Sequence, residues 1–540
     1  MQQAVLSFAD LIVRSPLVRW TWSGLADQNF PESLGEYRPS DHETVREMMA
    51  GRYLLASKLV DTKGVSPFAI EIVGGNWRRD LHAFSWLRHF RDARDDAERR
   101  FARTLVLDWI GRNSRFDPQS WAPALTSVRV LNWLRHLPLL TEGSNSDQAR
   151  LIKRSLGTQL QSLKLRGALA RDPMDAIYTA IALLGASLCD ESASKNVSLR
   201  LARLLELLDA QIDADGLHRS RNARVQFELL TELVSIRKAL AQRHSESLDA
   251  FGATMEKMHL ALDTLTLGTG EPAYFNGCGQ LPVDLVIAVQ SQGSSRRKNS
   301  TVLSGYGVLR SGSSTIIGDS GVVPPPGFSA NAHAGALAFE FSNGNDLVIG
   351  NCGPAPKEVT ENRTLFRLGA AHSGPTIDRM SSAQIVLRGP NAGSLRGFAD
   401  KCAAQVDDAE ATMILSSSAF SARFGIDLER QLTLIAEGQT LVGQDRFVGK
   451  PGVSAKGKLV LRFHLAPGAE TTRTENEDVI LIKLKSGVVW KFLWEGGVAS
   501  LDDSVRQSAH FGFFRTTQIV VEADIVAGEE VSWILTRDDG

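Results

Sequence analysis

Histidine side chains offer the first candidate chemistry in this chain, because an imidazole accepts and donates protons near neutral pH. His333 and His372 lie in loops rich in glycine and alanine, within the segment 324–376. Small residues on either side allow a bulky ligand to approach the backbone. We therefore take His333 and His372 as candidate catalytic residues. The alternative is that each is an ordinary histidine of a surface loop.

A second group of reactive side chains follows a turn signal, Asp215-Gly216. Arginines beside a helix N-terminus form a natural carboxylate site, because the guanidinium group and the helix dipole both attract an anion. The candidate substrate-binding residues here are Arg219, Arg221, Asn222 and Arg224, and His218 is a further candidate catalytic residue. Asn222 also suits the N-cap position of the following helix, which is its structural alternative.

Helices predicted in the first half of the chain must position that turn. Leu81, Phe84, Leu87 and Phe90 recur every three residues, as on the buried face of a helix. Further helices are predicted at Asp147–Leu169, Met174–Leu188, Leu199–Ile212, Arg224–Gln242 and Ser247–Leu265. Successive helices joined by short polar turns fit an α/α toroid. They fit an α-solenoid equally, but no repeat of fixed period is present.

From Ser304 onward, short apolar runs separated by turns replace the helical pattern. Leu337, Phe339 and Phe341 alternate with smaller or charged residues, which predicts a strand with one buried face. The predicted strands are Tyr306–Arg310, Ser314–Asp319, Ala336–Phe341, Asp346–Ile349, Ala383–Leu387, Gln431–Ala436, Thr440–Val442, Lys458–His464, Val479–Lys483, Val488–Phe492, Phe511–Glu522 and Glu530–Thr536. Such a series predicts a large antiparallel β-sandwich.

Composition narrows the class of protein and its partners. The 540 residues exceed what one hydrophobic core organises, so two domains are expected. Hydrophobic residues make up 43% and charged residues 22%, as in an ordinary soluble protein, and the formal net charge is −1. Without a basic field, no nucleic-acid partner is predicted. The 4 cysteines lack Cys-x-x-Cys spacing, which argues against a zinc ribbon or a disulfide framework.

The expected location is the cytoplasm. Residues 1–22 interrupt their apolar positions with Asp10, Arg14 and Arg19 and lack the apolar core of a signal peptide. No stretch approaches the roughly 20 apolar residues of a membrane span. The cysteines also suit a reducing compartment. A periplasmic location is the alternative.

Three motifs resemble the signature of the heparinase II/III family. They are His-Ala-Gly-Ala-Leu-Ala-Phe-Glu-Phe from His333, Val-Ile-Gly-Asn-Cys-Gly from Val348, and Ala-Ala-His-Ser around His372. Residues 76–87 are similar to the family's entry into its toroid, and Phe-Asn-Gly around Asn276 is similar to its domain boundary. Asn276 is therefore a further candidate substrate-binding residue. The resemblance implies an N-terminal α/α toroid, a C-terminal antiparallel β-sandwich and cleavage of acidic polysaccharides by β-elimination.

The chain departs from the family at the positions that carry this reaction. The family's catalytic tyrosine falls on Val225, the histidine after it on Gln226, and its catalytic asparagine on Asp172. A lyase of this kind neutralises a uronate carboxylate and removes a proton from the adjacent carbon, which neither valine nor aspartate achieves. Gly335 stands where the family often has an aspartate that binds metal. We therefore predict no metal and no cofactor.

The predicted architecture is α+β, with an N-terminal (α/α) toroid and a C-terminal antiparallel β-sandwich. An N-terminal extension at residues 1–75 packs on the toroid at 76–290. A linker at 291–303 leads to a heparinase II/III-like β-sandwich at 304–540.

The predicted function is that of a polysaccharide lyase acting on a uronate-containing acidic glycan. The alternative is a non-catalytic protein on the same scaffold that binds glycans or serves in envelope-polysaccharide biogenesis. The partner in both cases is an acidic polysaccharide or oligosaccharide. We expect His333, His372 and the turn Arg219–Arg224 to converge on one cleft, with Arg221 or Arg224 facing the substrate carboxylate.

Overall fold

The chain divides into two compact units, which we call the helical unit and the β unit. The helical unit consists of Met1–Gln211 and Leu229–Met255, and the β unit of Ile212–Glu228 and Glu256–Gly540. The computed structural model describes residues 15, 30–56, 58–70, 75–113, 116–167, 172–244, 248–294, 300–355, 362–449, 456–475, 478–509, 512–526 and 528–538. The segment 1–22 considered as a signal peptide lies outside this description except for Ser15, and so do residues 295–299 of the predicted linker.

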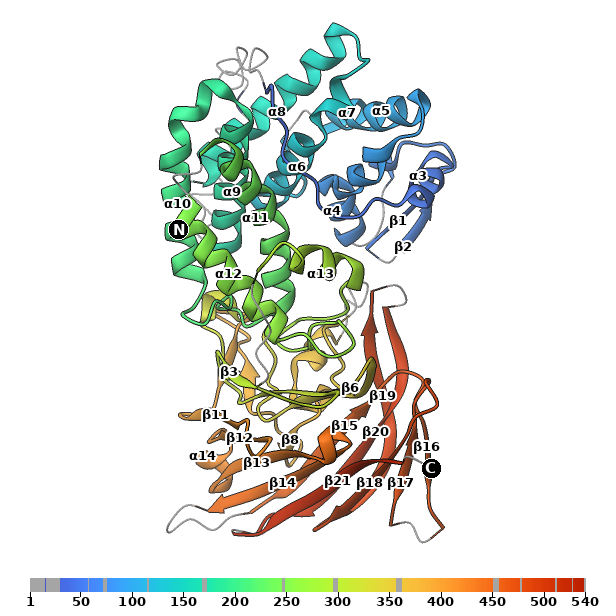
Figure 1. The fold of residues 1–540 in the computed structure, drawn as a ribbon, viewed down its shortest axis with the longest axis vertical. Coiled ribbons are helices and arrows are strands. Elements are labelled where there is room, and N and C mark those ends of the chain that lie inside the picture. The colour runs from blue at the N-terminus through green and yellow to red at the C-terminus, as the bar shows by residue number, and fades with distance from the viewer. Residues whose placement is uncertain are drawn as a thin grey trace. The chain divides into compact units, whose positions relative to one another are not determined.

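The N-terminal part of the chain is helical, as the apolar periodicity predicts (Figure 1). Its elements are α3 (His42–Met49), α4 (Gly75–Ala83), α5 (Asp96–Asn113), α6 (Pro123–Arg135), α7 (Leu137–Thr141), α8 (Ser146–Gly167), α9 (Pro173–Cys189), α10 (Val197–Gln211), α11 (Ala223–Arg243), α12 (Leu248–Thr264) and α13 (Val283–Gln290). A short hairpin of β1 (Arg52–Leu55) and β2 (Lys58–Asp61) follows α3.

Helix α9 shows how local sequence sets these boundaries. Asp172 is its N-cap, and the Asp172 carboxylate accepts hydrogen bonds from the backbone amides of Met174 and Asp175. Pro173 follows at the first helical position, where its missing amide proton costs nothing. Asp172, at the position of the family's catalytic asparagine, therefore serves to begin a helix.

The β unit contains two large sheets in which all the paired strands are antiparallel. One has the order β11-β12-β13-β14-β21-β18-β17-β16, and the other β19-β20-β15-β7-β6-β5-β4-β3, with β8 paired to β15. Figure 1 shows β14, β21, β18 and β17 of the first sheet side by side.

The bounds of these strands are β3 (Thr301–Leu303), β4 (Tyr306–Ser311), β5 (Ser314–Asp319), β6 (Phe339–Asn343), β7 (Asp346–Gly350), β8 (Pro375–Ile377), β11 (Cys402–Asp407), β12 (Thr412–Ser417), β13 (Ile426–Ile435), β14 (Thr440–Gly449), β15 (Lys458–Leu465), β16 (Glu470–Arg473), β17 (Ile480–Lys483), β18 (Val489–Glu495), β19 (Val498–Ser508), β20 (Gly512–Asp524) and β21 (Glu530–Asp538). A separate hairpin joins β9 (Ala383–Ile385) to β10 (Leu395–Gly397).

Apolar side chains from both sheets form one continuous core, which makes the β unit a sandwich. Trp533 of β21 lies within it. Its ring stacks on Phe339 at a centroid distance of 5.6 Å and meets Phe463 at 4.8 Å. Gly443 of β14 is paired with Trp533 across the ladder, and a Cβ at Gly443 would lie 2.1 Å from the indole. Only glycine leaves room for this ring.

The strand predicted at Ala336–Phe341 is wrong at its start and in its exposure. Strand β6 begins at Phe339, because Leu337 adopts a φ of 60° that no strand residue has. Glu340 is fully buried, so both faces of β6 are covered. A hydrogen bond of 2.9 Å from Arg506 Nη1 to the Glu340 carboxylate explains how the sheet accommodates this acid.

None of the helices that the structure describes combines the length and apolar character needed to cross a lipid bilayer.

We expect Gly443→Ala to destabilise the β unit by about 1–3 kcal/mol, because overpacking a core against a rigid ring costs that much. The matched control is Gly327→Ala, since a Cβ at Gly327 would meet no heavy atom within 4 Å. Urea unfolding followed by tryptophan fluorescence measures both variants. Equal unfolding midpoints would contradict the packing described here.

Candidate functional site

All the predicted site residues lie in the β unit, where the turn before α11 is held tightly. Arg221 has a φ of 55°, and the Arg221 amide donates a 2.7 Å hydrogen bond to the carbonyl oxygen of His218. Asn222 Oδ1 accepts a 2.9 Å hydrogen bond from the Arg224 amide. This confirms Asn222 as the N-cap of α11.

The guanidinium group of Arg221 is buried against Asp319 at the end of β5. Arg221 Nη2 donates to Asp319 Oδ1 at 2.8 Å, and both side chains are only 4% exposed. Arg221 Nε donates to the Ser304 carbonyl at 2.8 Å, and Nη1 to the Val322 carbonyl. Burial would lower the pKa of Arg221, but the Asp319 carboxylate more than offsets this and raises it. The charge of Arg221 is thus balanced inside the protein.

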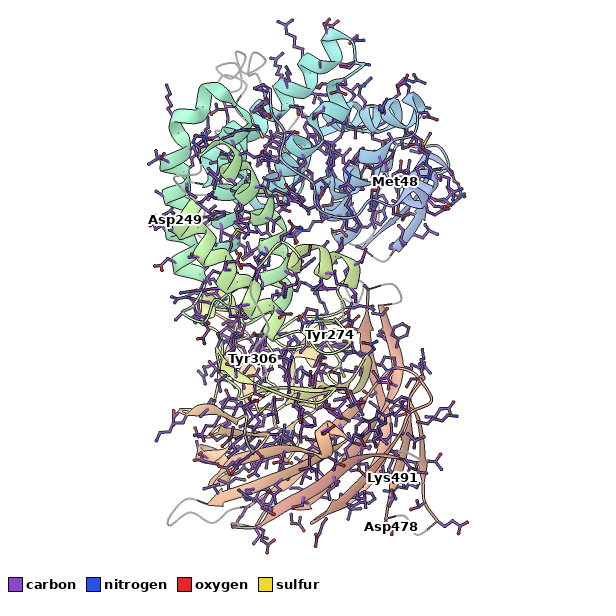
Figure 2. All side chains as sticks on the ribbon, viewed as in Figure 1. Met48, Asp249, Tyr274, Tyr306, Asp478 and Lys491 are labelled. Carbon is purple, nitrogen blue, oxygen red and sulfur yellow. The ribbon has the colours of Figure 1, made fainter. Side chains whose placement is uncertain are left out.

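Asn276 and Tyr306 extend this network toward the histidine loop (Tyr306 is labelled in Figure 2). Asn276 Nδ2 donates to Tyr306 Oη at 2.6 Å, and Tyr306 Oη donates to the Arg221 carbonyl at 2.7 Å. Asn276 Oδ1 accepts the His333 amide at 3.1 Å. The Arg221 guanidinium also lies over the Tyr306 ring, 4.1 Å from its centroid. The structure therefore connects Arg221, Asn276 and His333 through buried contacts.

His333 and His372 are in direct contact. Their ring centroids are 4.8 Å apart, and the side chains are buried. Burial lowers the pKa of His372 to about 3, and burial together with His372 and Arg367 holds the pKa of His333 well below its ordinary value. His333 Nδ1 and both ring nitrogens of His372 have no hydrogen-bond partner among the described residues. These rings are therefore neutral at physiological pH.

The hairpin of β9 and β10 packs beside the loop that carries His333. Ala383 and Leu395 of the hairpin pack against Ala332 and Ala334, which flank His333. Arg367 fastens the arrangement, since its Nε donates to the Ala332 carbonyl at 2.9 Å and its Nη1 to the Gly393 carbonyl at 2.8 Å. The loop carrying His333 is closed over by protein.

The other candidates have separate environments. His218 is buried beside Phe328 at a ring centroid distance of 5.4 Å, and burial lowers its pKa to about 4. Arg224 Nη2 donates to the Gln280 carbonyl at 2.7 Å. Arg219 is exposed. Of these candidates, Arg219 and the half-buried Arg224 are the ones that solvent reaches.

The positions that match the family's catalytic residues have structural roles here. Gln226 is fully buried, and its amide donates to the carbonyl oxygens of Gly216 and Met258. Val225, half-buried, carries no titratable group. Asp172 caps α9.

The residues around His333 do not fit a metal ion. A Cβ at Gly335 would lie 3.2 Å from the His372 ring, so the space for an aspartate at that position is taken. Within the described residues, no group of three or more His, Cys, Asp or Glu side chains is arranged to hold a metal.

Sequence reasoning missed Asp319 and Tyr306. Asp319 ends a predicted strand whose residues are all buried, and a buried carboxylate requires a cation or several hydrogen-bond donors. The position of Asp319 at the end of an apolar strand could therefore have indicated that this acid pairs with a buried cation such as Arg221.

Comparison with known proteins shows which other proteins share this fold. Residues 294–534 match the family described as heparinase II/III-like, C-terminal. A heparan sulfate lyase HepC mutant from Pedobacter heparinus covers 100% of this chain and 88% of its own, with a TM-score of 0.61 and 15% identity. Heparinase III covers 88% of this chain and 79% of its own, with a TM-score of 0.67 and 14% identity. The helical region followed by an antiparallel sheet domain is thus confirmed as the two-domain fold of these enzymes.

A different relative is similar along nearly the whole sequence. FtsZ-localized protein C of Caulobacter vibrioides is 28% identical over 544 residues, which cover 94% of this chain and 91% of that protein.

We expect Asp319→Asn to destabilise the β unit by about 3–5 kcal/mol, because it leaves Arg221 buried without a carboxylate. Asp346→Asn is the control, since the Asp346 carboxylate accepts from Ser486 Oγ at the surface. We expect the control to change stability by about 0.5 kcal/mol or less. Urea unfolding midpoints give both values. A loss below about 1 kcal/mol in Asp319→Asn would mean that Arg221 does not depend on this partner.

We also expect stability to fall as the pH falls from about 6.5 toward 3. His464 of β15 is buried like His372. An unfolded histidine binds a proton near pH 6.5, whereas in the folded chain burial lowers the pKa of both rings to about 3. Between these values the unfolded chain holds more protons, which costs about 1.4 kcal/mol per pH unit for each ring. Unfolding at pH 7.5 and 5.5 measures this loss. The double variant His372→Gln/His464→Gln should lose less stability over that interval, and an unchanged loss would be inconsistent with neutral buried rings.

Proposed function

We propose that this chain, whose residues 294–534 match the heparinase II/III-like C-terminal family, binds an acidic glycan without cleaving it. β-Elimination needs a cation that faces the substrate carboxylate and a base that works near neutral pH. The observation that carries the proposal is the burial of Arg221 against Asp319, which commits the best-placed cation to the protein itself.

The candidate bases support the same conclusion. His333 and His372 are buried, and burial keeps both pKa values far below neutrality. A base of such low pKa removes a carbon-bound proton poorly. Val225 and Asp172 supply neither a phenol nor an amide at the positions that resemble the family's catalytic pair.

We further propose that the protein works in the bacterial division apparatus together with FtsZ. The support is the similarity to FtsZ-localized protein C, which is 28% identical over 94% of this chain, against 14–15% identity for the lyases. The proposed location is the cytoplasm. All four cysteines, Cys189, Cys278, Cys352 and Cys402, are unpaired, which suits a reducing compartment.

A lyase acting on a uronate-containing glycan is the second candidate. It is favoured by the direct contact between His333 and His372, two histidines in motifs that resemble the family signature. This function would require the two buried rings to become accessible to the substrate.

We expect the whole chain to bind uronate-containing polysaccharides without producing the near-ultraviolet absorbance of an unsaturated uronate. Retardation in native gels containing each polysaccharide measures binding, and a neutral polysaccharide is the control. New absorbance that falls by about 10²–10⁴-fold in His333→Ala would establish the lyase instead.

For the division role, we expect a fluorescent fusion of this protein to colocalise with FtsZ in dividing cells. A diffuse signal would count against that role.

A further inference from the structure

The helical unit contains an open pocket of about 460 Å³ that the function proposed above does not use. Its lining includes Arg78 and Arg79 of α4, Ser120, and Asp175 of α9. Both arginine side chains are exposed. Pockets of this volume suit ligands about the size of a sugar or a small cofactor.

A buried cation lies directly behind the pocket wall. Arg129 of α6 is fully buried, and its Nη1 donates to the carbonyl oxygens of Ser120 at 2.8 Å and His82 at 3.2 Å, two residues that line the pocket. Among the described residues, no carboxylate contacts Arg129. Its other hydrogen bonds go to Gln159 and Thr126, and its guanidinium carbon lies 4.4 Å from the ring centroid of Trp109 and 5.8 Å from that of Trp121. Burial lowers the pKa of Arg129 to about 9. Oxygen acceptors and aromatic rings stabilise this charge in part, and an anion in the adjacent pocket would stabilise it further.

A buried hydroxyl group also belongs to the pocket lining. Ser120 is only 3% exposed, and among the described residues its Oγ meets no partner with full hydrogen-bond geometry, although it lies near the Asp117 carboxylate and helps to lower the pKa of that group. The backbone of Ser120 is fixed on both sides, because its amide donates to Asp117 Oδ2 at 2.8 Å and its carbonyl accepts from Arg129. A hydroxyl in this position is able to donate a hydrogen bond to a ligand in the pocket.

Helix dipoles add to the positive electrostatic potential in the pocket. Pocket-lining residues belong to the first turns of α4, α6 and α9, whose amino ends attract anions. Helix α6 has no side-chain cap at Ala122, and Asp175 Oδ1 instead accepts the Ala124 amide at 2.9 Å. Three carboxylates, Asp117, Asp172 and Asp175, lie among these groups, and Asp172 already caps the amino end of α9. The positive character of the pocket therefore comes from Arg78, Arg79 and the buried Arg129 behind the wall.

We propose that this pocket binds a small sugar through one compact anionic group, a phosphate or a carboxylate, held by Arg78 and Arg79. Ser120 Oγ donates to the ligand, and Asp175 accepts from a sugar hydroxyl. The choice of a sugar rests on the proposed glycan-binding function, whereas the anion site rests on the charges described here.

Calorimetric titration of the whole chain with glucose 1-phosphate, glucuronate, inorganic phosphate and glucose tests this site. The tighter of the first two ligands identifies the anionic group, and neutral glucose should bind at least tenfold more weakly. Arg78→Ala/Arg79→Ala should weaken binding by about tenfold for each arginine, because each loses a charged hydrogen bond. The matched control is Arg150→Ala/Arg154→Ala, which removes two exposed arginines of α8. Ser120→Ala should weaken binding by about threefold to tenfold.

Two results would overturn the proposed anion site. One is equal anion binding by the Arg78→Ala/Arg79→Ala variant and the α8 control, and the other is no binding of either anionic sugar. If acidic polysaccharide binds the Arg78→Ala/Arg79→Ala variant as tightly as the original chain, glycan binding is supported and this site is rejected. Glucose 1-phosphate that binds through Arg78 and Arg79, with no polysaccharide bound, would support the pocket and reject glycan binding.

Discussion

The ion pair between Arg221 and Asp319 is the interaction on which the organisation of the candidate site depends. Two buried charges are tolerated only because each satisfies the other, with carbonyl oxygens and Asn276 completing the hydrogen bonds. The pair fixes the turn before α11 to the end of β5, and Asn276 connects it to the backbone of His333. Arg221 therefore stabilises the fold and does not bind a ligand.

This arrangement explains how the chain keeps the fold of the lyases while Arg221 is not exposed to a substrate. The buried apolar core and the polar contacts of Glu340 with Arg506 maintain the sandwich whether or not catalysis occurs. The histidines in the resembling motifs are buried and pack against each other. Arg78 and Arg79, at the pocket of the helical unit, are exposed, unlike the buried Arg221.

Periodicity predicted much of the fold, because burial on one helix face leaves a clear trace in sequence. The helix predicted at Met174–Leu188 corresponds to α9 (Pro173–Cys189). Strand β19 (Val498–Ser508) was missed, since its polar residues form a strand only by pairing along β20. The site was harder to foresee. The partnership of Arg221 with Asp319 joins residues 98 positions apart, and no local pattern records such a contact.

The most direct test of the central claim is the protonation state of the buried histidines while a glycan is bound. Nitrogen-15 chemical shifts of labelled imidazole rings, recorded from pH 8 to 5 with and without an acidic polysaccharide, report this state. The account predicts that His333 and His372 stay neutral throughout, with the ligand present or absent. A ring that titrates near neutral pH once the polysaccharide is added would contradict it and would place an acid–base residue at the site.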